Sequence, residues 1–186
     1  LHRGKRLVDA EARDGAVVAR FDDGTHATAD ILVGADGLHS RTRRIIDPHA
    51  PAPRYTGQLS LGGIARATGW EPTPGAYHMI FGRRAFFGYS VTPRGDAYWF
   101  ANVAEPREPS RAELAAIAPR AWKDRLVDIF AGDEGPAVAM IQATHTEVAA
   151  WPIHDMPVVP VWHRGGMVLV GDAAHATSPS SGQGAA

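Results

Sequence analysis

Residues 168–186 read VLVGDAAHATSPSSGQGAA, in which strand-forming residues run directly into glycine and small residues. Val168–Val170 lead to Gly171 and Asp172, and a second glycine-rich group closes the stretch. A loop of this composition leaves its backbone N–H groups accessible, because no bulky side chains cover them. The stretch therefore predicts a buried strand followed by a turn that exposes its backbone and could start a helix.

A second stretch of the same kind, DILVGADGLHSRTRRIID, occupies residues 30–47. Its apolar residues Ile31–Val33 predict another buried strand, and residues 34–37 form a tight Gly-Ala-Asp-Gly turn. The residues from about Leu38 to Ile46 predict a basic helix that ends before Pro48. A buried strand, a glycine turn and a helix are typical of an open α/β sheet, which binds ligands at the carboxyl ends of its strands.

The rest of the chain predicts a hairpin, a second sheet and two helices. Residues 6–21 read as two strands around Asp14-Gly15, and Asp23-Gly24 makes the next turn. After Pro48 the pattern predicts a separate antiparallel sheet, with strands at residues 58–67, 76–81, 85–92 and 97–103. Ser110 and Glu113 are spaced as a capping box, and Pro119 divides the following segment into two helices.

Composition excludes several classes of protein. The chain has 186 residues, 45% hydrophobic and 21% charged, with a formal net charge of -1. These values are typical of a globular protein and predict no nucleic-acid partner. The absence of cysteine excludes disulfides and thiolate sites and favours a cytoplasmic location. Because no apolar run approaches the roughly 20 residues of a membrane span, we expect no stable membrane insertion.

The two glycine turns together resemble those of the class A flavoprotein monooxygenases, FAD-dependent aromatic hydroxylases such as para-hydroxybenzoate and salicylate hydroxylases. Residues 34–43, GADGLHSRTR, match every fixed position of that family's DG motif, G-A-D-G-x-x-S-x-x-R. Residues 171–184, GDAAHATSPSSGQG, match its GD motif, G-D-A-A-H-x-x-x-P-x-x-G-Q-G. The resemblance covers essentially the whole chain, because the motifs lie near its two ends with a strand-rich insert between them.

The resemblance implies an α/β (α+β) fold, in which an incomplete FAD/NAD(P)-binding Rossmann-like domain carries an inserted substrate domain with a mixed or antiparallel sheet. Residues 1–47 would belong to the FAD-binding domain, residues 48–160 would form the substrate domain, and residues 161–186 would return to the FAD-binding domain. The family's G-x-G-x-x-G loop, which holds the ADP half of FAD, does not occur in the sequence. We therefore expect this chain to be a fragment that is inactive and retains no flavin by itself.

The GD motif implies most of the flavin contacts. After the turn at Gly171, Asp172 would bond a ribityl or ribose hydroxyl of FAD, and Pro179 would shape the wall over the reactive face of the flavin. Backbone N–H groups would face the pyrimidine edge of the flavin, where negative charge develops; they belong to Gly182, Gln183 and Gly184.

The DG motif implies two further cofactor-binding residues. Asp36 would act near the FAD pyrophosphate through water or a neighbouring group, and Arg43 would support the turn and the transient NAD(P)H. Without the motif, the sequence RTRR would favour a solvated position for Arg43.

We expect structural roles for the other residues whose side chains could take part in chemistry or binding. His175 is expected to pack or to bond the backbone rather than to act as an acid or base, and the nine histidines show no metal-ligand spacing. No metal site is predicted. Most aromatic residues of the middle sheet are expected in the core, and a few to line a pocket for an aromatic substrate; they are Trp70, Tyr77, Phe81, Phe86, Phe87, Tyr89, Tyr98, Trp99 and Phe100.

The reaction implied by the resemblance reduces FAD with NAD(P)H, captures O2 as a flavin C4a-hydroperoxide, and transfers one oxygen atom to a small aromatic substrate. The sequence identifies no side chain as an acid or base catalyst, so catalytic residues stay unknown, as does the oligomeric state. The alternatives are a related flavoprotein reductase, a halogenase or a non-catalytic remnant of the fold. The halogenase motif W-x-W-x-I-P is absent from the sequence, which weighs against that alternative.

Overall fold

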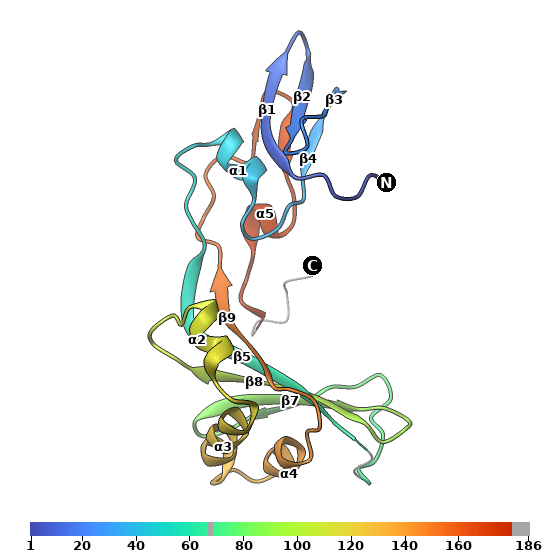
Figure 1. Ribbon diagram of the computed structural model, residues 1–186, viewed down its shortest axis with the longest axis vertical. Helices are drawn as coiled ribbons and strands as arrows, with labels where there is room; N and C mark the ends of the chain where they lie inside the picture. Colours follow the sequence, from blue (N-terminus) through green and yellow to red (C-terminus); the bar gives the residue numbers. More distant parts are fainter. Residues whose placement is uncertain (67–68, 180–186) are drawn as a thin grey trace. The chain divides into compact units, whose positions relative to one another are not determined.

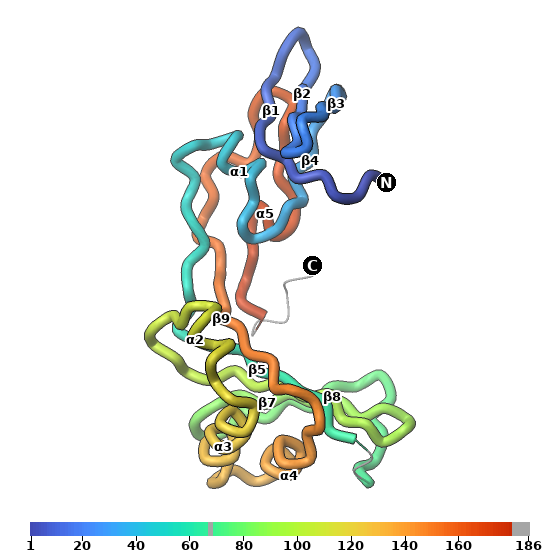
Figure 2. The backbone as a smooth tube through the Cα atoms, viewed as in Figure 1, coloured from blue at the N-terminus to red at the C-terminus, as the bar shows by residue number. Residues whose placement is uncertain are grey.

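The computed structural model describes residues 1–66 and 69–179 and divides the chain into two compact units (Figure 1). Unit 1 consists of Leu1–Thr56 together with the chain from His154 onward, and unit 2 consists of Gly57–Ile153. The backbone trace shows that unit 2 is a continuous insertion between the two parts of unit 1 (Figure 2). The predicted substrate domain, residues 48–160, extends beyond unit 2 at both ends, and its function stays a prediction.

The first sheet of unit 1 is an antiparallel meander of β1 (Leu7–Arg13), β2 (Ala16–Phe21) and β3 (His26–Ala29). The turn between β1 and β2 has positive φ at Asp14 (51°) and Gly15 (80°). An Asp-Gly pair with both residues in this region makes the tight two-residue turn that matches the twist of paired strands. The predicted hairpin is therefore confirmed.

The second sheet of unit 1 contains both glycine turns. Its order is β10 (His163–Arg164), β11 (Met167–Leu169), β4 (Leu32–Gly34), and β11 runs parallel to β4. The short helices α1 (Arg41–Ile46) and α5 (Asp172–His175) follow β4 and β11. A small apolar core connects these elements; its buried residues include Ile46, Met167, Leu169, Ala173 and Ala174.

Two predictions for the segment around β4 are wrong. Ile31 and Val33 are not buried, because 62% and 54% of their surfaces are exposed. β4 is an edge strand, and alternate side chains of a strand point to opposite faces, so only part of the apolar run reaches the core. The helix begins at Arg41 rather than Leu38, because the Ser40 side chain accepts a hydrogen bond from the backbone N–H of Arg43 and thereby caps the helix.

Unit 2 is built on a five-stranded sheet with the order β6-β7-β8-β5-β9. β5 pairs with β8, β8 with β7 and β7 with β6, all antiparallel, which confirms the predicted antiparallel sheet. The first strand was predicted at residues 58–67; β5 starts earlier, at Arg54, and ends at Ala65, and residue 67 lies outside the described residues. The bounds of the strands are Arg54–Ala65 for β5, His78–Phe81 for β6, Ala85–Val91 for β7, Ala97–Ala104 for β8 and Ala149–Asp155 for β9.

Helices α3 (Pro119–Phe130) and α4 (Ala137–Gln142) cover one face of this sheet (Figure 1). Pro119 occupies the first turn of α3 and separates it from α2 (Arg111–Ala116), as predicted. The capping box at the start of α2 is also confirmed, since Ser110 and Glu113 exchange both of its hydrogen bonds. α4 was not predicted. No helix among the described residues is long and apolar enough to cross a membrane.

Candidate cofactor site

The parallel pairing of β4 and β11 brings the two glycine turns together. Leu32 pairs with Met167 and Gly34 with Leu169, so both strands end at the same edge of the sheet. The backbone N–H of Val170 also donates to the carbonyl oxygen of Gly34 at 3.0 Å. Two turns more than 130 residues apart in the sequence thus form one continuous edge, where α/β sheets bind their ligands.

The Asp36 carboxylate forms hydrogen bonds with the first turn of α1. It accepts hydrogen bonds from the Ser40 hydroxyl at 2.5 Å, the Arg41 N–H at 2.8 Å and the Thr42 N–H at 2.9 Å. Burial raises the pKa of Asp36, but the hydrogen bonds from Ser40 and Thr42 outweigh this effect and hold it below its usual value. Asp36 is therefore an ionised carboxylate that orders the turn, and its role at the pyrophosphate stays a prediction.

Gly34 is required by the close approach of α1 to the end of β4. A Cβ atom at this position would lie 2.6 Å from Thr42 Cγ2 and 2.7 Å from Thr42 Cβ. Both distances are far shorter than van der Waals contact, so a larger residue would push α1 away from the strand. The first glycine of the DG motif thus positions α1, whose first N–H groups are bonded to Asp36.

Arg43 joins the two motifs. Its guanidinium is fully buried, and it donates to the Ala173 carbonyl oxygen at 2.8 Å and to the Leu38 carbonyl oxygen at 2.7 Å. Burial, with a smaller effect from Arg44, lowers the pKa of Arg43, although an arginine stays charged at neutral pH. A solvated position for Arg43 is therefore wrong, and contact with NAD(P)H stays a prediction.

Gly171 and Asp172 form the opposite side of the edge. Gly171 has φ 57° and ψ -141°, a conformation that residues with a Cβ rarely adopt, and it lets the chain turn sharply into α5. The Asp172 side chain is exposed and has no hydrogen-bond partner among the described residues. A free carboxylate next to two strand ends suits a ligand with hydroxyl groups, as predicted for FAD.

The remaining residues of the GD motif are only partly described. The His175 ring stacks on Trp162 with centroids 5.6 Å apart and an interplanar angle of 25°, in agreement with the predicted packing role. Pro179 is exposed, and its contact with the flavin stays a prediction. Gly182, Gln183 and Gly184 lie outside the described residues.

The sequence interpretation missed the roles of Ser40, Thr42 and Trp162. Ser40 was recognised only as a motif position, although a serine directly before a helical segment is a common helix cap. Thr42 donates its hydroxyl to Asp36 at 3.1 Å and packs on Gly34, and no separate sequence pattern indicates either contact. Trp162 lies 13 residues from His175, and no local pattern connects the two rings.

Comparison with known proteins identifies the family. Residues 1–185 match the family model described as FAD binding domain. The chain belongs to this family. Its relatives include the 6-hydroxynicotinate 3-monooxygenase of Pseudomonas fluorescens, 32% identical over 188 residues that cover 98% of this chain and 47% of the relative. The chloroplastic zeaxanthin epoxidase of Solanum lycopersicum is 31% identical over 179 residues, which cover 96% of this chain and 26% of that relative.

Solved structures of FAD-binding domain proteins resemble this chain closely. Klebsiella pneumoniae HpxO complexed with FAD and uric acid has a TM-score of 0.82 and 28% identity, over 97% of this chain and 45% of HpxO. A salicylate hydroxylase substrate complex has a TM-score of 0.75 and 26% identity, over 97% of this chain and 48% of the hydroxylase. The chain spans about half the length, or less, of the proteins that it matches.

These matches confirm the resemblance to class A flavoprotein monooxygenases and the Rossmann-like fold class. They also confirm FAD as the cofactor of the family. The residues present fit this group, because the two turns converge on one edge that offers the Asp172 carboxylate, which has no partner within residues 1–66 and 69–179. The individual residue contacts with FAD stay predictions.

Proposed function

We propose that this chain forms the flavin edge and the substrate sheet of an FAD-dependent monooxygenase that uses NAD(P)H and O2 to hydroxylate an aromatic substrate. The observation that carries the proposal is the Arg43 bridge, which fastens the DG turn to the GD turn at the ends of β4 and β11. The bridge holds the two turns side by side, so a ligand at this edge can contact both of them. The predicted cytoplasmic location is part of the proposal.

FAD, when bound, supplies the redox and oxygen chemistry of this reaction. The residues of this chain would position the cofactor at the ends of β4 and β11. Asp172 would accept a hydrogen bond from a sugar hydroxyl, and Asp36 and Arg43 keep the two turns in register. Because Asp36 and Arg43 are each held by several hydrogen bonds, the two turns are organised before the cofactor arrives.

The aromatic substrate would bind on the sheet of unit 2. Named relatives and neighbours act on or bind ring compounds, including 6-hydroxynicotinate and uric acid. The face of the sheet opposite α3 and α4 presents aromatic side chains of β6, β7 and β8, which suit a flat apolar ring. This assignment leaves the choice between NADH and NADPH open.

The proposal is tested with Asp172→Ala in the complete reading frame that contains this chain. We expect FAD affinity to fall by about 1–3 kcal/mol, because a bound hydroxyl would lose its acceptor. Flavin content after dialysis, read from the absorbance spectrum, measures the effect. Asp30→Ala is the matched control, since Asp30 is an exposed aspartate at the opposite end of β4. Equal flavin retention in both variants would contradict the proposed cofactor contact.

Activity is tested separately with a panel of phenols and aromatic acids. We expect some of these compounds to perturb the flavin spectrum and to accelerate NAD(P)H oxidation with consumption of O2. If the protein holds flavin but no compound of the panel changes its spectrum or its rate of NAD(P)H oxidation, a reductase or halogenase is favoured. A protein that retains no flavin at all would favour a non-catalytic remnant.

A further inference from the structure

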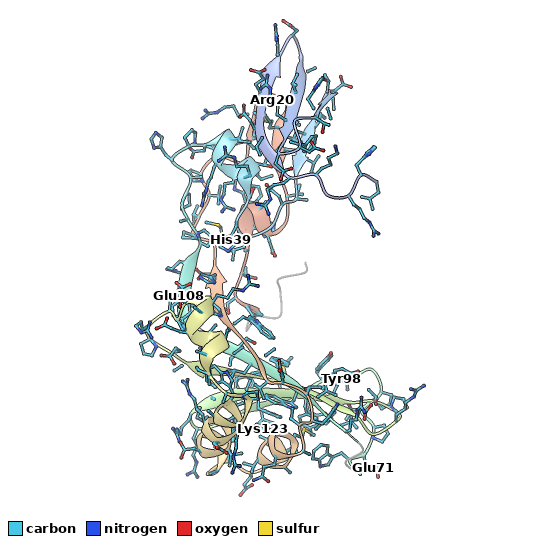
Figure 3. The ribbon with its side chains drawn as sticks, in the orientation of Figure 1. Arg20, His39, Glu71, Tyr98, Glu108 and Lys123 are labelled. Carbon is cyan, nitrogen blue, oxygen red and sulfur yellow. The ribbon has the colours of Figure 1, made fainter. Side chains whose placement is uncertain are left out.

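One face of the unit 2 sheet is built from aromatic and small residues. The core residues Leu61, Phe87 and Trp99 point toward the helices, so the residues that alternate with them point to the opposite face. We call this opposite side the aromatic face; its residues are Gln58, Ser60, Gly62, Ile64, Met79, Phe81, Phe86, Gly88, Ser90, Tyr98, Phe100 and Asn102. Figure 3 shows Tyr98 on this side and Lys123 among the helices.

Three phenylalanine rings form a continuous row on the aromatic face. The Phe81 and Phe86 centroids lie 5.2 Å apart at an interplanar angle of 71°, and the Phe86 and Phe100 centroids lie 5.5 Å apart. The row crosses β6, β7 and β8, which pair directly in this order. Rings at these separations support one another in fixed orientations, so the row is an ordered surface for a further ring.

Two glycines decide where the ring of Phe100 lies. Phe100 pairs with Gly88 on one side and with Gly62 on the other. A Cβ atom on Gly88 would lie 2.4 Å from Phe100 Cε1, so the ring rests directly on the Gly88 backbone. A Cβ atom on Gly62 would meet the Trp151 ring at 3.8 Å, which places Trp151 beside the same row. Gly62 thus lies between two aromatic side chains.

Every residue of the aromatic face is uncharged. The nearby cations lie in the turns between its strands, among the helices or at its ends. Arg83 and Arg94 are exposed in the turns that follow β6 and β7. Arg84, in the turn before β7, is bonded to Asp128 of α3, and Lys123 donates to the Thr144 carbonyl oxygen. At one end of β5, Arg54 is paired with Asp155, and Arg66 follows one residue after the other end.

We propose that the aromatic face selects uncharged, planar aromatic substrates over aromatic carboxylates, and that Gly88 and Phe100 determine this specificity. The proposal rests on the proposed function and narrows its substrate class. A carboxylate over the Phe86 and Phe100 rings would lose hydration and would find no cation among the residues of the face, which is unfavourable. A neutral ring keeps the full gain of stacking and apolar contact.

The test compares pairs of ligands of similar shape that carry either a neutral amide or a carboxylate, 4-hydroxybenzamide with 4-hydroxybenzoate and salicylamide with salicylate. The FAD-loaded protein from the complete reading frame is titrated by calorimetry and by flavin absorbance. We expect each amide to bind at least about tenfold more tightly than its acid at neutral pH. Equal or tighter binding of the acids would overturn the proposal, and so would a failure of all four compounds to bind. Arg66→Gln then identifies the cation responsible if the acids bind.

A pair of variants tests the role of the two specificity residues. Gly88→Ala forces the Phe100 ring away from the sheet, so we expect the amides to lose about tenfold in affinity. Gly132→Ala is the matched control, because an added Cβ there meets no atom within 4 Å. Unchanged binding in Gly88→Ala would overturn the assignment of these residues. The flavin content of each preparation separates the two proposals, since a protein without FAD contradicts the proposed function rather than the specificity.

Discussion

The interiors of the two units differ in chemistry. Unit 1 buries Ser40, Thr42, Arg43 and Asp47 among small apolar residues such as Ala173. Unit 2 buries large aromatic side chains, which are Phe87, Trp99, Trp122 and Phe130. Hydrogen bonds depend on particular donors and acceptors, whereas apolar packing tolerates many residues of suitable size. Unit 2 also buries polar residues, but those described there, Ser60, Asn102 and Thr144, are uncharged. The interior of unit 1 therefore depends more on residue identity, and that of unit 2 depends more on residue volume.

The largest expected effect is in unit 2, from Phe130→Ala. Phe130 is 1% exposed, and its ring meets Phe87 edge to face at 5.4 Å. Removing it should destabilise unit 2 by about 3–5 kcal/mol, because a cavity remains in the core. Hydrogen exchange resolved by peptide measures this change for each unit separately.

Phe81→Ala is the control for this variant, because Phe81 lies in the same unit and is 83% exposed. We expect its effect on the stability of unit 2 to be below about 1 kcal/mol. If Phe130→Ala accelerates hydrogen exchange in unit 1 as much as in unit 2, the two units unfold together. Their stabilities could then not be contrasted.

The corresponding variant of unit 1 is Arg43→Met, which preserves much of the side-chain volume and removes the donors. The carbonyl oxygens of Ala173 and Leu38 would lose their partner inside the protein. We expect unit 1 to lose about 2–4 kcal/mol, because unpaired buried groups are costly. Arg44→Met is the control, since Arg44 is exposed on the same helix. If both variants unfold at the same denaturant concentration, the bridge does not stabilise unit 1.

Gly34→Ala tests the same dependence of unit 1 on residue identity by adding a single methyl group. The added methyl group would overlap Thr42 and displace α1, at a cost of about 1–3 kcal/mol. Gly37→Ala tests the other reason for a glycine in this turn, because Gly37 has φ 75° and no atom within 4 Å of an added Cβ. We expect it to cost about 1 kcal/mol of backbone strain. Thermal unfolding ranks the two variants, and a larger effect at Gly37 would contradict the packing argument.

The sequence predicted those features that follow from local patterns. Asp14-Gly15 encodes its hairpin, and Pro119 fixes the start of α3, because each depends on the backbone preference of one or two residues. The two motifs located the two glycine turns that meet at the ends of β4 and β11, which is the proposed flavin edge. The alternating apolar residues of β7 and β8 predicted the sheet of unit 2.

Features that depend on distant parts of the chain could not be predicted. The exposure of Ile31 and Val33 depends on which strands lie beside β4. The burial of Arg43 depends on Ala173, 130 residues away, and a run of arginines by itself favours a solvated face. The row of phenylalanines follows from strand register, which no single strand determines.

Asp36 carries the smallest predicted effect, which depends on pH. Its carboxylate accepts several hydrogen bonds, but it is partly exposed, so solvent screens its charge and limits its contribution. Asp36→Asn weakens these bonds and should cost unit 1 about 1 kcal/mol at neutral pH. Asp30→Asn, an exposed aspartate without these bonds, is the control.

The dependence on pH follows from the direction of the pKa shift. The pKa of Asp36 is lower in the folded protein than in the unfolded chain. An aspartate in an unfolded chain has a pKa of about 3.9. The stabilisation by Asp36 is therefore complete above that value and is lost as the pH falls through the lower folded-state pKa. The difference in unfolding free energy between the native chain and Asp36→Asn should thus be constant from about pH 5 to 7. It should shrink toward zero below about pH 4. Urea unfolding across this range measures the difference, and a difference that persists in acid would mean that the carboxylate charge does not hold the turn.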